Sequence, residues 1–287
     1  MKKFLLIFVV LLFGCNKSEI SVSTNSQAQD SNQVSILSFN IQIFGVSKIS
    51  KPEVVRILVD IIKDYDIIAV QEVRDSSATA VVEFMKLLPL NYSYIIGPRE
   101  GRSSSKEQYW FIYDSTKFKV LGNNTYPDLQ DVFERNPEGV YFQHINEIFD
   151  FVLINKHVAP GDAVNEISYI PLLFDYYSSL YNELDVIVVG DFNADGSYFN
   201  ESKLIEIFPE EKYTIIIDNS LNTTVAASQN TYDRIIISKS MQEDFQGKYG
   251  VYVFNDIIDF SKLTIQPKEV SDHYPVWAYF FIDRDTN

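Results

Sequence analysis

The strand-like segments of this chain are apolar nearly throughout, and this pattern constrains the fold more than any other feature. Asp66–Gln71 and Asp185–Val189 carry Ile and Val at successive positions, and Val34–Asn40 is a similar short run. Strands of this kind are buried rather than half-exposed. Helical patterns alternate with them along the chain. We therefore expect an α+β fold in which two stacked sheets are covered by helices on both outer faces.

The same periodicities predict three helices and a set of further strands. The first helix begins near Pro52, where Ser50 and Glu53 fit a capping box, and one of its faces is apolar at Val54, Ile57, Leu58, Ile61 and Ile62. A second helix is expected over Ala78–Leu88, with Val81, Val82, Met85 and Leu88 inward, and a third over Val164–Glu183. The remaining predicted strands are Tyr92–Ile96, Gln108–Tyr113, Val140–His144, Phe149–His157, Tyr213–Ile217, Arg234–Ile237, Tyr249–Phe254 and Tyr274–Ile282.

The N-terminus has the composition of a bacterial lipoprotein signal. Lys2 and Lys3 precede an unbroken apolar run, Phe4–Phe13, which is shorter than the about 20 residues that a membrane-spanning helix needs. Leu-Phe-Gly then leads to Cys15, the only cysteine of the chain and the expected lipidation site. An ordinary cleaved signal that contains a cysteine is the alternative. We expect a signal peptide over 1–14, a flexible polar tether over 15–32 and one folded domain over 33–287.

The charge of the chain limits how it could bind nucleic acid. The formal net charge is −15, so the overall field does not steer the protein toward a polyanion. A local cationic patch or a bound metal would have to overcome this repulsion. The acidity by itself fits solubility outside the cell.

Polar residues gather where the apolar strands end. Gly190–Asp195 (GDFNAD) places Asp191 at the end of a buried strand and Asn193 two positions later. These supply a metal ligand and a donor to a phosphate oxygen, although Asp and Asn also favour turns. Asp272 and His273 precede the last strand, and such a pair could bind a metal with one group and make a base with the other.

Three more strand-end residues carry chemistry of the same kind. Asp233 could orient an imidazole as the acid of a triad does, or form a surface ion pair with Arg234. Glu72 ends a buried strand, where a carboxylate is costly unless it is paired or metal-bound. Asn40 ends the first strand. Of the three histidines, His144 is not part of such a strand-end motif and is expected to be structural.

Together these segments resemble the endonuclease/exonuclease/phosphatase superfamily and, within it, the deoxyribonuclease I family. The matching stretches, in family order, are Phe39–Gly45 (FNIQIFG), Tyr65–Asp75 (YDIIAVQEVRD), Gly101–Phe111 (GRSSSKEQYWF), His157–Val164 (HVAPGDAV), Gly190–Tyr198 (GDFNADGSY), Thr223–Ile236 and Val270–Pro275 (VSDHYP). The resemblance implies a four-layer α/β/β/α sandwich of two mostly antiparallel sheets. It also implies a metal-dependent endonuclease that hydrolyses the DNA backbone, which the N-terminal signal would place outside the cytoplasm.

The resemblance further implies a role for each strand-end residue. Glu72 would hold Mg²⁺, with Mn²⁺ as an alternative, and Asp272, Asp191 and Asn40 would lie close by. Asn193 would contact the scissile phosphate. His157 and His273 would be the catalytic imidazoles, oriented by Glu107 and Asp233, with His273 preferred as the base and His157 as the acid. Arg74, Arg102 and Arg135 would lie along DNA, with solvated surface charge as the alternative for Arg102.

The sequence departs from the family pattern at several places. Ser105 stands where the family has a tyrosine that packs in the minor groove. The family disulfide would join positions that are now Gly196 and Asn230. At one family calcium site Asn222 replaces an Asp and Ala226 a Thr, so weak or absent structural calcium is expected there.

Other readings remain open at this stage. The first is another enzyme of the fold, namely a sphingomyelinase, an inositol-phosphate phosphatase or an abasic-site endonuclease. The second is a non-catalytic surface lipoprotein, but all the catalytic positions are present. We expect a monomer that takes DNA as its substrate and meets the membrane only through its lipid anchor.

Overall fold

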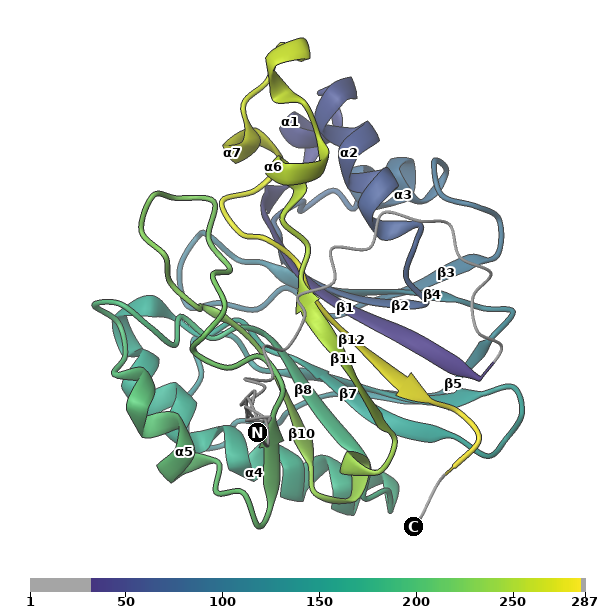
Figure 1. Cartoon of the computed structure of the whole chain (residues 1–287), viewed down its shortest axis with the longest axis vertical. Helices are drawn as coiled ribbons and strands as arrows, with labels where there is room; N and C mark the ends of the chain where they lie inside the picture. The colour runs from purple at the N-terminus through teal and green to yellow at the C-terminus, as the bar shows by residue number, and fades with distance from the viewer. Residues whose placement is uncertain (1–31, 285–287) are drawn as a thin grey trace, which may run out of the picture. The chain divides into compact units, whose positions relative to one another are not determined.

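The computed structural model describes residues 32–284, and within this range the strands form two six-stranded sheets (Figure 1). The first sheet has the strand order β11-β12-β1-β2-β4-β3 and the second β5-β6-β7-β8-β10-β9. The strands of the first sheet are β1 (Gln33–Phe44), β2 (Ile67–Val73), β3 (Tyr92–Ile96), β4 (Gln108–Asp114), β11 (Phe245–Val251) and β12 (Val276–Phe281). Those of the second are β5 (Phe118–Thr125), β6 (Glu138–His144), β7 (Asp150–Asn155), β8 (Val186–Asp191), β9 (Tyr213–Ile215) and β10 (Asp233–Ser238).

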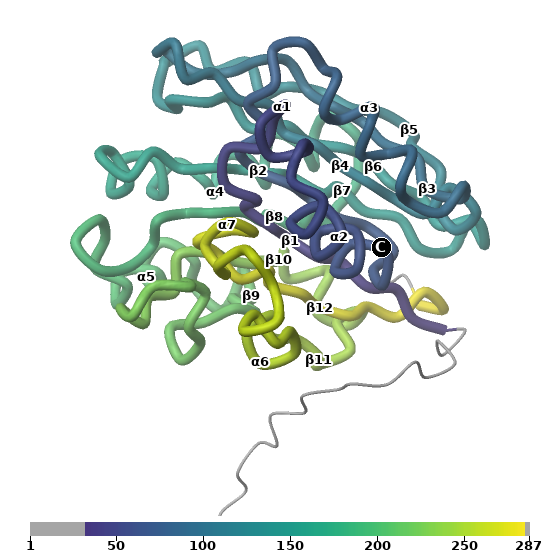
Figure 2. The backbone as a smooth tube through the Cα atoms, turned by 90° about the horizontal axis from the view of Figure 1, so that it is seen from above, coloured from purple at the N-terminus to yellow at the C-terminus, as the bar shows by residue number. Residues whose placement is uncertain are grey.

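Among the described strands, each sheet has one parallel pair, and it lies at the centre. β1 pairs with β2 and β7 pairs with β8 in parallel, whereas every other neighbouring pair is antiparallel. The two parallel pairs face each other, because β1 and β2 contact β8 and β2 contacts β7 (Figures 1 and 2). The carboxyl ends of these four strands therefore meet at one edge of the interface between the sheets.

Helices cover both outer faces, so the expected four-layer sandwich is confirmed. Near the first sheet lie α1 (Val46–Ile49), α2 (Pro52–Ile62), α3 (Thr79–Met85), α6 (Phe254–Ile257) and α7 (Pro267–Val270), and near the second lie α4 (Ala163–Tyr181) and α5 (Leu204–Ile207) (Figure 1). Short 3₁₀ turns are η1 (Pro160–Asp162), η2 (Glu201–Lys203), η3 (Ser240–Gln242) and η4 (Phe260–Lys262). In the described part of the chain, no helix combines the length and the apolar character needed to cross a membrane.

Three apolar cores correspond to the three interfaces between layers. One lies between α2 or α3 and the first sheet, one between the sheets, and one between α4 and the second sheet. Alternate residues of β1 serve two cores, since Ile36 packs between the sheets and Leu37 packs under the helices. Every central strand is therefore buried on both faces, which explains its continuous apolar sequence.

The expected apolar face of α2 is confirmed, but its expected capping box is not formed. All five predicted inward residues are buried. The N-cap is Lys51, while the Ser50 hydroxyl donates to the carbonyl of Ser47 at 2.8 Å. Glu53 instead accepts from the Thr264 backbone N–H at 3.0 Å. Pro52 occupies the first helical turn, where its missing N–H costs nothing.

The predicted inward face of α3 is wrong at one position. Val82 is 43% exposed, and Phe84 is buried in its place. The Phe84 ring packs edge-on against both Phe44 and Trp110 with centroids 5.6 Å apart. A large ring that fills this space sets the phase of the short helix more strongly than a valine does.

The predicted signal peptide, the Cys15 lipidation site and most of the tether lie outside the described residues.

Candidate active site

The polar strand ends converge at one edge of the interface between the two sheets. Every second residue of a strand points toward the interface between the sheets. Along β8 and β1 these inward positions are apolar at first and become polar at the carboxyl end of the series. On β8 the inward series runs Ile187, Val189, Asp191, and on β1 it runs Ile36, Ser38, Asn40. The predicted site residues that this arrangement brings together are Asn40, Glu72, Glu107, His157, Asp191, Asp233 and His273.

Asp191 lies at the centre of this cluster. Its Oδ2 atom is 3.0 Å from Asn40 Nδ2, 3.5 Å from His157 Nε2 and 3.4 Å from His273 Nε2. Its Oδ1 atom accepts from the backbone N–H of Asn193 at 2.9 Å. One carboxylate therefore lies between two imidazoles, one from the segment after β7 and one from the segment before β12.

Each imidazole is held by a second, buried carboxylate. Glu107 Oε1 lies 2.9 Å from His157 Nδ1, and Asp233 Oδ2 lies 2.8 Å from His273 Nδ1. The Asp233 contact is a hydrogen bond to Nδ1 of His273, which leaves Nε2 of that ring facing the site, whereas the Glu107 contact with His157 is an ion-pair distance. Both carboxylates are almost fully buried, which strengthens their hold on the rings.

The two histidines have opposite electrostatics. Burial, followed by the nearby Arg135 guanidinium, lowers the pKa of His157 to about 3. Burial also opposes the charge of His273, but the carboxylates of Asp233 and Asp191 outweigh it and raise its pKa to about 10. At neutral pH one ring is therefore neutral and the other carries a proton.

Glu72 lies in a strained backbone segment beside Asn40. Its Oε1 atom accepts from Asn40 Nδ2 at 3.2 Å and its Oε2 atom accepts from the Ile43 N–H at 2.9 Å. Gln42, Ile43 and Glu72 all have positive φ, at 45°, 51° and 63°. The β1–β2 register shifts between Asn40 and Phe44. Such conformations are costly for residues with a side chain and concentrate at functional sites.

Two of the residues predicted to bind metal, Asp272 and Glu72, have features that suit a magnesium-like ion. The Oδ1 atom of Asp272 is buried and lacks a hydrogen-bond partner, as expected of an oxygen reserved for a cation. Opposing its burial, the Arg74 guanidinium and the hydrogen bonds from the Ile43 N–H and Asn40 lower the pKa of Glu72. No cage of three or more His, Cys, Asp or Glu side chains occurs among the described residues. Mg²⁺ does not need one, because it keeps several waters and is bound through one or two carboxylates.

Two of the three predicted DNA-contacting arginines belong to the cluster. Arg135 forms an ion pair with Glu107 and its side chain is 11% exposed. Arg74 lies 3.3 Å from Glu72 and is 26% exposed. Arg102 is separate from them: it is 45% exposed and pairs with Asp131 at 2.9 Å. Arg135 thus pairs with Glu107, the carboxylate that contacts His157.

The sequence did not indicate a buried lysine beside the part of β1 that carries Asn40. Lys48 Nζ donates to the carbonyls of Ile41, Gln42 and Val270 at 2.6, 2.6 and 3.0 Å. It thereby joins β1 to the segment that precedes Asp272. Burial lowers the pKa of Lys48 to about 8. A lone lysine gives no signal of such a role in the sequence.

A second buried cation was also missed, beneath His157. Lys156 forms a 2.6 Å ion pair with Glu166, and both side chains are almost inaccessible to solvent. The Lys156 ammonium also donates to the carbonyl of Arg135 at 2.9 Å. The Tyr109 hydroxyl accepts from the His157 N–H at 2.9 Å. These contacts fix the loop that carries His157 to α4 and β4.

The residues without a place in the cluster have local roles. His144 Nδ1 accepts from the Asn146 N–H at 3.2 Å, and its ring packs edge-on against Phe118, which agrees with a structural histidine. Asn222 Oδ1 accepts from both the N–H and the hydroxyl of Thr224 at 3.0 Å. A Cβ at Gly196 would lie 3.5 Å from Asn230 Oδ1, so the two positions of the family disulfide are neighbours.

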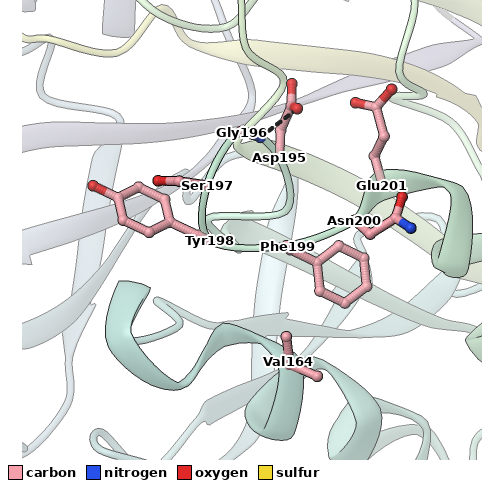
Figure 3. Close-up of a pocket in the computed structure, with 8 residues that line it drawn as sticks. All are labelled: Val164, Asp195, Gly196, Ser197, Tyr198, Phe199, Asn200 and Glu201. Atoms are coloured by element: carbon pink, nitrogen blue, oxygen red, sulfur yellow. Dashed lines mark hydrogen bonds between the residues drawn. The ribbon is translucent and has the colours of Figure 1, made fainter.

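A shallow hollow of about 430 Å³ lies beyond the Asp191–Asn193 turn (Figure 3). Phe199 lies on the side of Val164, whereas the carboxylates of Asp195 and Glu201 lie on the opposite side (Figure 3). Its lining is Val164 and 195–201, which includes none of the predicted site residues.

Known proteins are similar to this chain in sequence. The chain matches the Endonuclease/Exonuclease/phosphatase family over residues 37–273. Deoxyribonuclease-1 of Bos taurus is 33% identical over 267 residues, covering 84% of this chain and 90% of the bovine protein. Deoxyribonuclease-1 of Homo sapiens is 33% identical over 263 residues, with 86% and 92% covered.

Solved structures share the fold at lower identity. An endonuclease/exonuclease/phosphatase family protein from Bacteroides thetaiotaomicron has a TM-score of 0.62 at 17% identity, covering 88% of this chain and 95% of that one. A mannosyl-6-phosphatase from the same species has a TM-score of 0.59 at 15% identity, covering 85% and 98%.

Proposed function

Because the chain belongs to the endonuclease/exonuclease/phosphatase family and is similar to deoxyribonuclease I, we propose that it is a metal-dependent endonuclease that hydrolyses the DNA backbone. The family and the relatives support a phosphodiester hydrolase, and DNA is the finer assignment. The observation that carries the proposal is the pair of buried histidine–carboxylate units that meet at Asp191, with Nε2 distances of 3.5 and 3.4 Å.

The two imidazoles divide the proton transfers of hydrolysis. One Nε2 accepts a proton from the attacking water, and the other donates a proton to the leaving oxygen. Glu107 and Asp233 keep each ring in the tautomer and orientation that this needs. The electrostatics favour His157 as the acceptor and His273 as the donor, since the pKa of His157 is about 3 and that of His273 about 10. This is the reverse of the assignment preferred from the sequence.

Glu72 and Asp272 would hold Mg²⁺, with Asn40 and Asp191 beside them, and Mn²⁺ has the same ligand preference. The bound ion would offset the negative charge that grows on the phosphate during hydrolysis. Glu72 suits this role because three neighbours already fix its carboxylate: Asn40, the Ile43 N–H and Arg74.

The substrate phosphate would be held by amide and guanidinium groups. Asn193 Nδ2 donates one hydrogen to the Val158 carbonyl at 3.0 Å, which leaves its second hydrogen for a phosphate oxygen. Of the three arginines predicted to contact DNA, Arg74 and Arg102 are the more exposed. Each is ion-paired, with Glu72 and Asp131, so the bound metal would add the local positive charge that a protein of net charge −15 needs to bind a polyanion.

The N-terminal sequence supports a place outside the cytoplasm, with the protein held to a bacterial membrane through lipid on Cys15. Metabolic labelling with a radioactive fatty acid tests this part separately. Label in the wild-type protein and none in Cys15→Ser is expected, whereas equal label would overturn the anchor.

Nicking of supercoiled plasmid by the full-length protein tests the proposed activity. We expect nicking with Mg²⁺, none with a chelator, and recovery when Mg²⁺ is restored in excess. A folded protein that leaves plasmid intact but cleaves sphingomyelin, an inositol phosphate or an abasic-site duplex would replace DNA with that substrate. Nicking in excess chelator would overturn the role of metal.

A further inference from the structure

The proposed catalytic groups come from both sheets. Glu72 and Asn40 lie on strands of the first sheet, and His273 lies on the segment that leads into it. Asp191 and Asp233 lie on strands of the second sheet, and His157 lies just after β7 of the same sheet. The short distances around Asp191 therefore hold only while the two sheets keep one fixed register.

Most of the interface between the sheets is apolar and does not by itself fix that register. Apolar side chains such as Ile36, Ala69 and Val189 fill the space, and their attraction has little directionality. Hydrogen bonds depend strongly on distance and angle. A buried hydrogen bond across the interface would accordingly define one position of the sheets.

Gln71 and Asn155 form such a link. Gln71 lies on β2 and Asn155 ends β7, and both are fully buried. Gln71 Nε2 donates to Asn155 Oδ1 at 2.7 Å, and Asn155 Nδ2 donates to the Val70 carbonyl at 3.0 Å. Gln71 Nε2 also lies 3.1 Å from Ser38 Oγ on β1. Two hydrogen bonds thus pass from one sheet to the other.

The link lies directly beneath the catalytic groups. Gln71 immediately precedes Glu72, and Asn155 lies two positions before His157. Buried amides are costly where their partners are out of reach, so the sheets are held where these amides meet. No step of the proposed hydrolysis uses either side chain.

We infer that Gln71 and Asn155 are positioning residues, which lock the two sheets in the register that brings the metal-binding side of the active site against the His157 side. This inference rests on the proposed function for its kinetic consequences. Misplacement of reacting groups by about 1 Å costs about 100-fold in rate. Loss of the link should therefore lower kcat, with little change in KM for DNA.

A double-mutant cycle in the full-length protein tests the inference. The variants are Gln71→Leu, Asn155→Leu and the double variant, with kcat and KM from plasmid nicking and Tm from thermal unfolding. Replacing both partners with apolar groups of similar size leaves stability nearly unchanged, so the double variant should keep a Tm close to wild type. Its kcat should fall about 10- to 100-fold, and each single variant should lose about as much as the double.

Ser35→Ala is the matched control. Ser35 is buried on β1 and bonds Asp66 Oδ2 at 2.8 Å, but it lies at the other end of the strand from Asn40. Loss of the Ser35 hydroxyl should lower Tm and leave kcat unchanged. A merely structural role for the link would give the same result for Asn155→Leu and would overturn the inference. If the double leucine variant does not fold, Asn155→Ala takes its place, since Gln71 keeps Ser38 as a partner.

An NMR readout separates this inference from the proposed function. The chain has three histidines, so the imidazole resonances of His157 and His273 can be assigned with variants. Displacement of the sheets should shift both resonances in the double leucine variant, without substrate or metal. Unshifted resonances would overturn the positioning role, whether or not the wild-type protein cleaves DNA. An inactive wild type with shifted resonances would count only against the function.

Discussion

Asp233→Asn is the substitution that most directly probes how the site controls a proton. The pKa of His273 is raised from 6.5 to about 10, which corresponds to about 5 kcal/mol in favour of the imidazolium. Asp233 is the largest favourable contributor, through its charge and through the 2.8 Å hydrogen bond, followed by the charge of Asp191. Its removal should forfeit about 3 kcal/mol, equal to a fall of about 2 in the pKa of His273.

The same substitution should reduce turnover severely. An asparagine presents an N–H or a weaker acceptor to Nδ1, so the ring loses both its tautomer and its charge stabilisation. The equivalent change in serine-protease triads costs about 10⁴ in kcat, and we expect about 10³ to 10⁴ here. NMR titration of His273 and initial rates of plasmid nicking measure the two effects.

Asp150→Asn is the control for Asp233→Asn, because Asp150 lies on the same sheet and contacts Tyr141 and Gln143 rather than a catalytic group. It should leave both the pKa of His273 and kcat unchanged. A folded Asp233→Asn protein with kcat within tenfold of wild type, or with an unmoved His273 pKa, would refute the reasoning.

Three further predictions concern stability. Lys48→Met should lower the free energy of unfolding by about 2–4 kcal/mol in a denaturant titration, because two buried carbonyls and one partly buried carbonyl lose their donor; an unchanged midpoint would contradict this. In chelator, the stability contributed by His157 should be lost as pH falls from 6.5 toward 3, because its pKa is lowered in the folded protein. The stability contributed by His273 should be lost as pH rises from 6.5 through 10, because its pKa is raised in the folded protein. The difference in unfolding free energy between wild type and His157→Asn, and between wild type and His273→Asn, should change with pH with opposite slopes in denaturant titrations. Differences that do not change with pH would refute the prediction. Micromolar calcium should leave Tm nearly unchanged, because Asn222 replaces a carboxylate ligand and already bonds Thr224; a rise of many degrees would contradict this.

Local patterns predicted the layers because each central strand is buried on both faces. The apolar run of β8 ends at Asp191, and the helical spacing in α2 places its apolar residues inward. These signals are contained in adjacent residues, so a single sequence carries them. The resemblance to deoxyribonuclease I then connected Glu107 and Asp233 with the two histidines, which no local pattern could do.

The sequence could not predict contacts that depend on tertiary neighbours. Strand β5 was missed because Phe118–Thr125 includes Gly122 and two asparagines and has few apolar residues. Lys48 and the Lys156–Glu166 pair become visible only when the groups that compensate their burial are in place. The pKa order of the two histidines likewise depends on Arg135, a residue first assigned to DNA contact.

The central claim is that the two imidazoles work as one unit around Asp191. The most direct test is kcat for plasmid nicking by His157→Ala, His273→Ala and the double variant, each checked for folding. Each single variant should lose several orders of magnitude in kcat, and the double variant should lose little more than either, because groups that act together are not additive. Near-normal turnover in either single variant, or a double variant whose loss is the product of the two, would contradict the account.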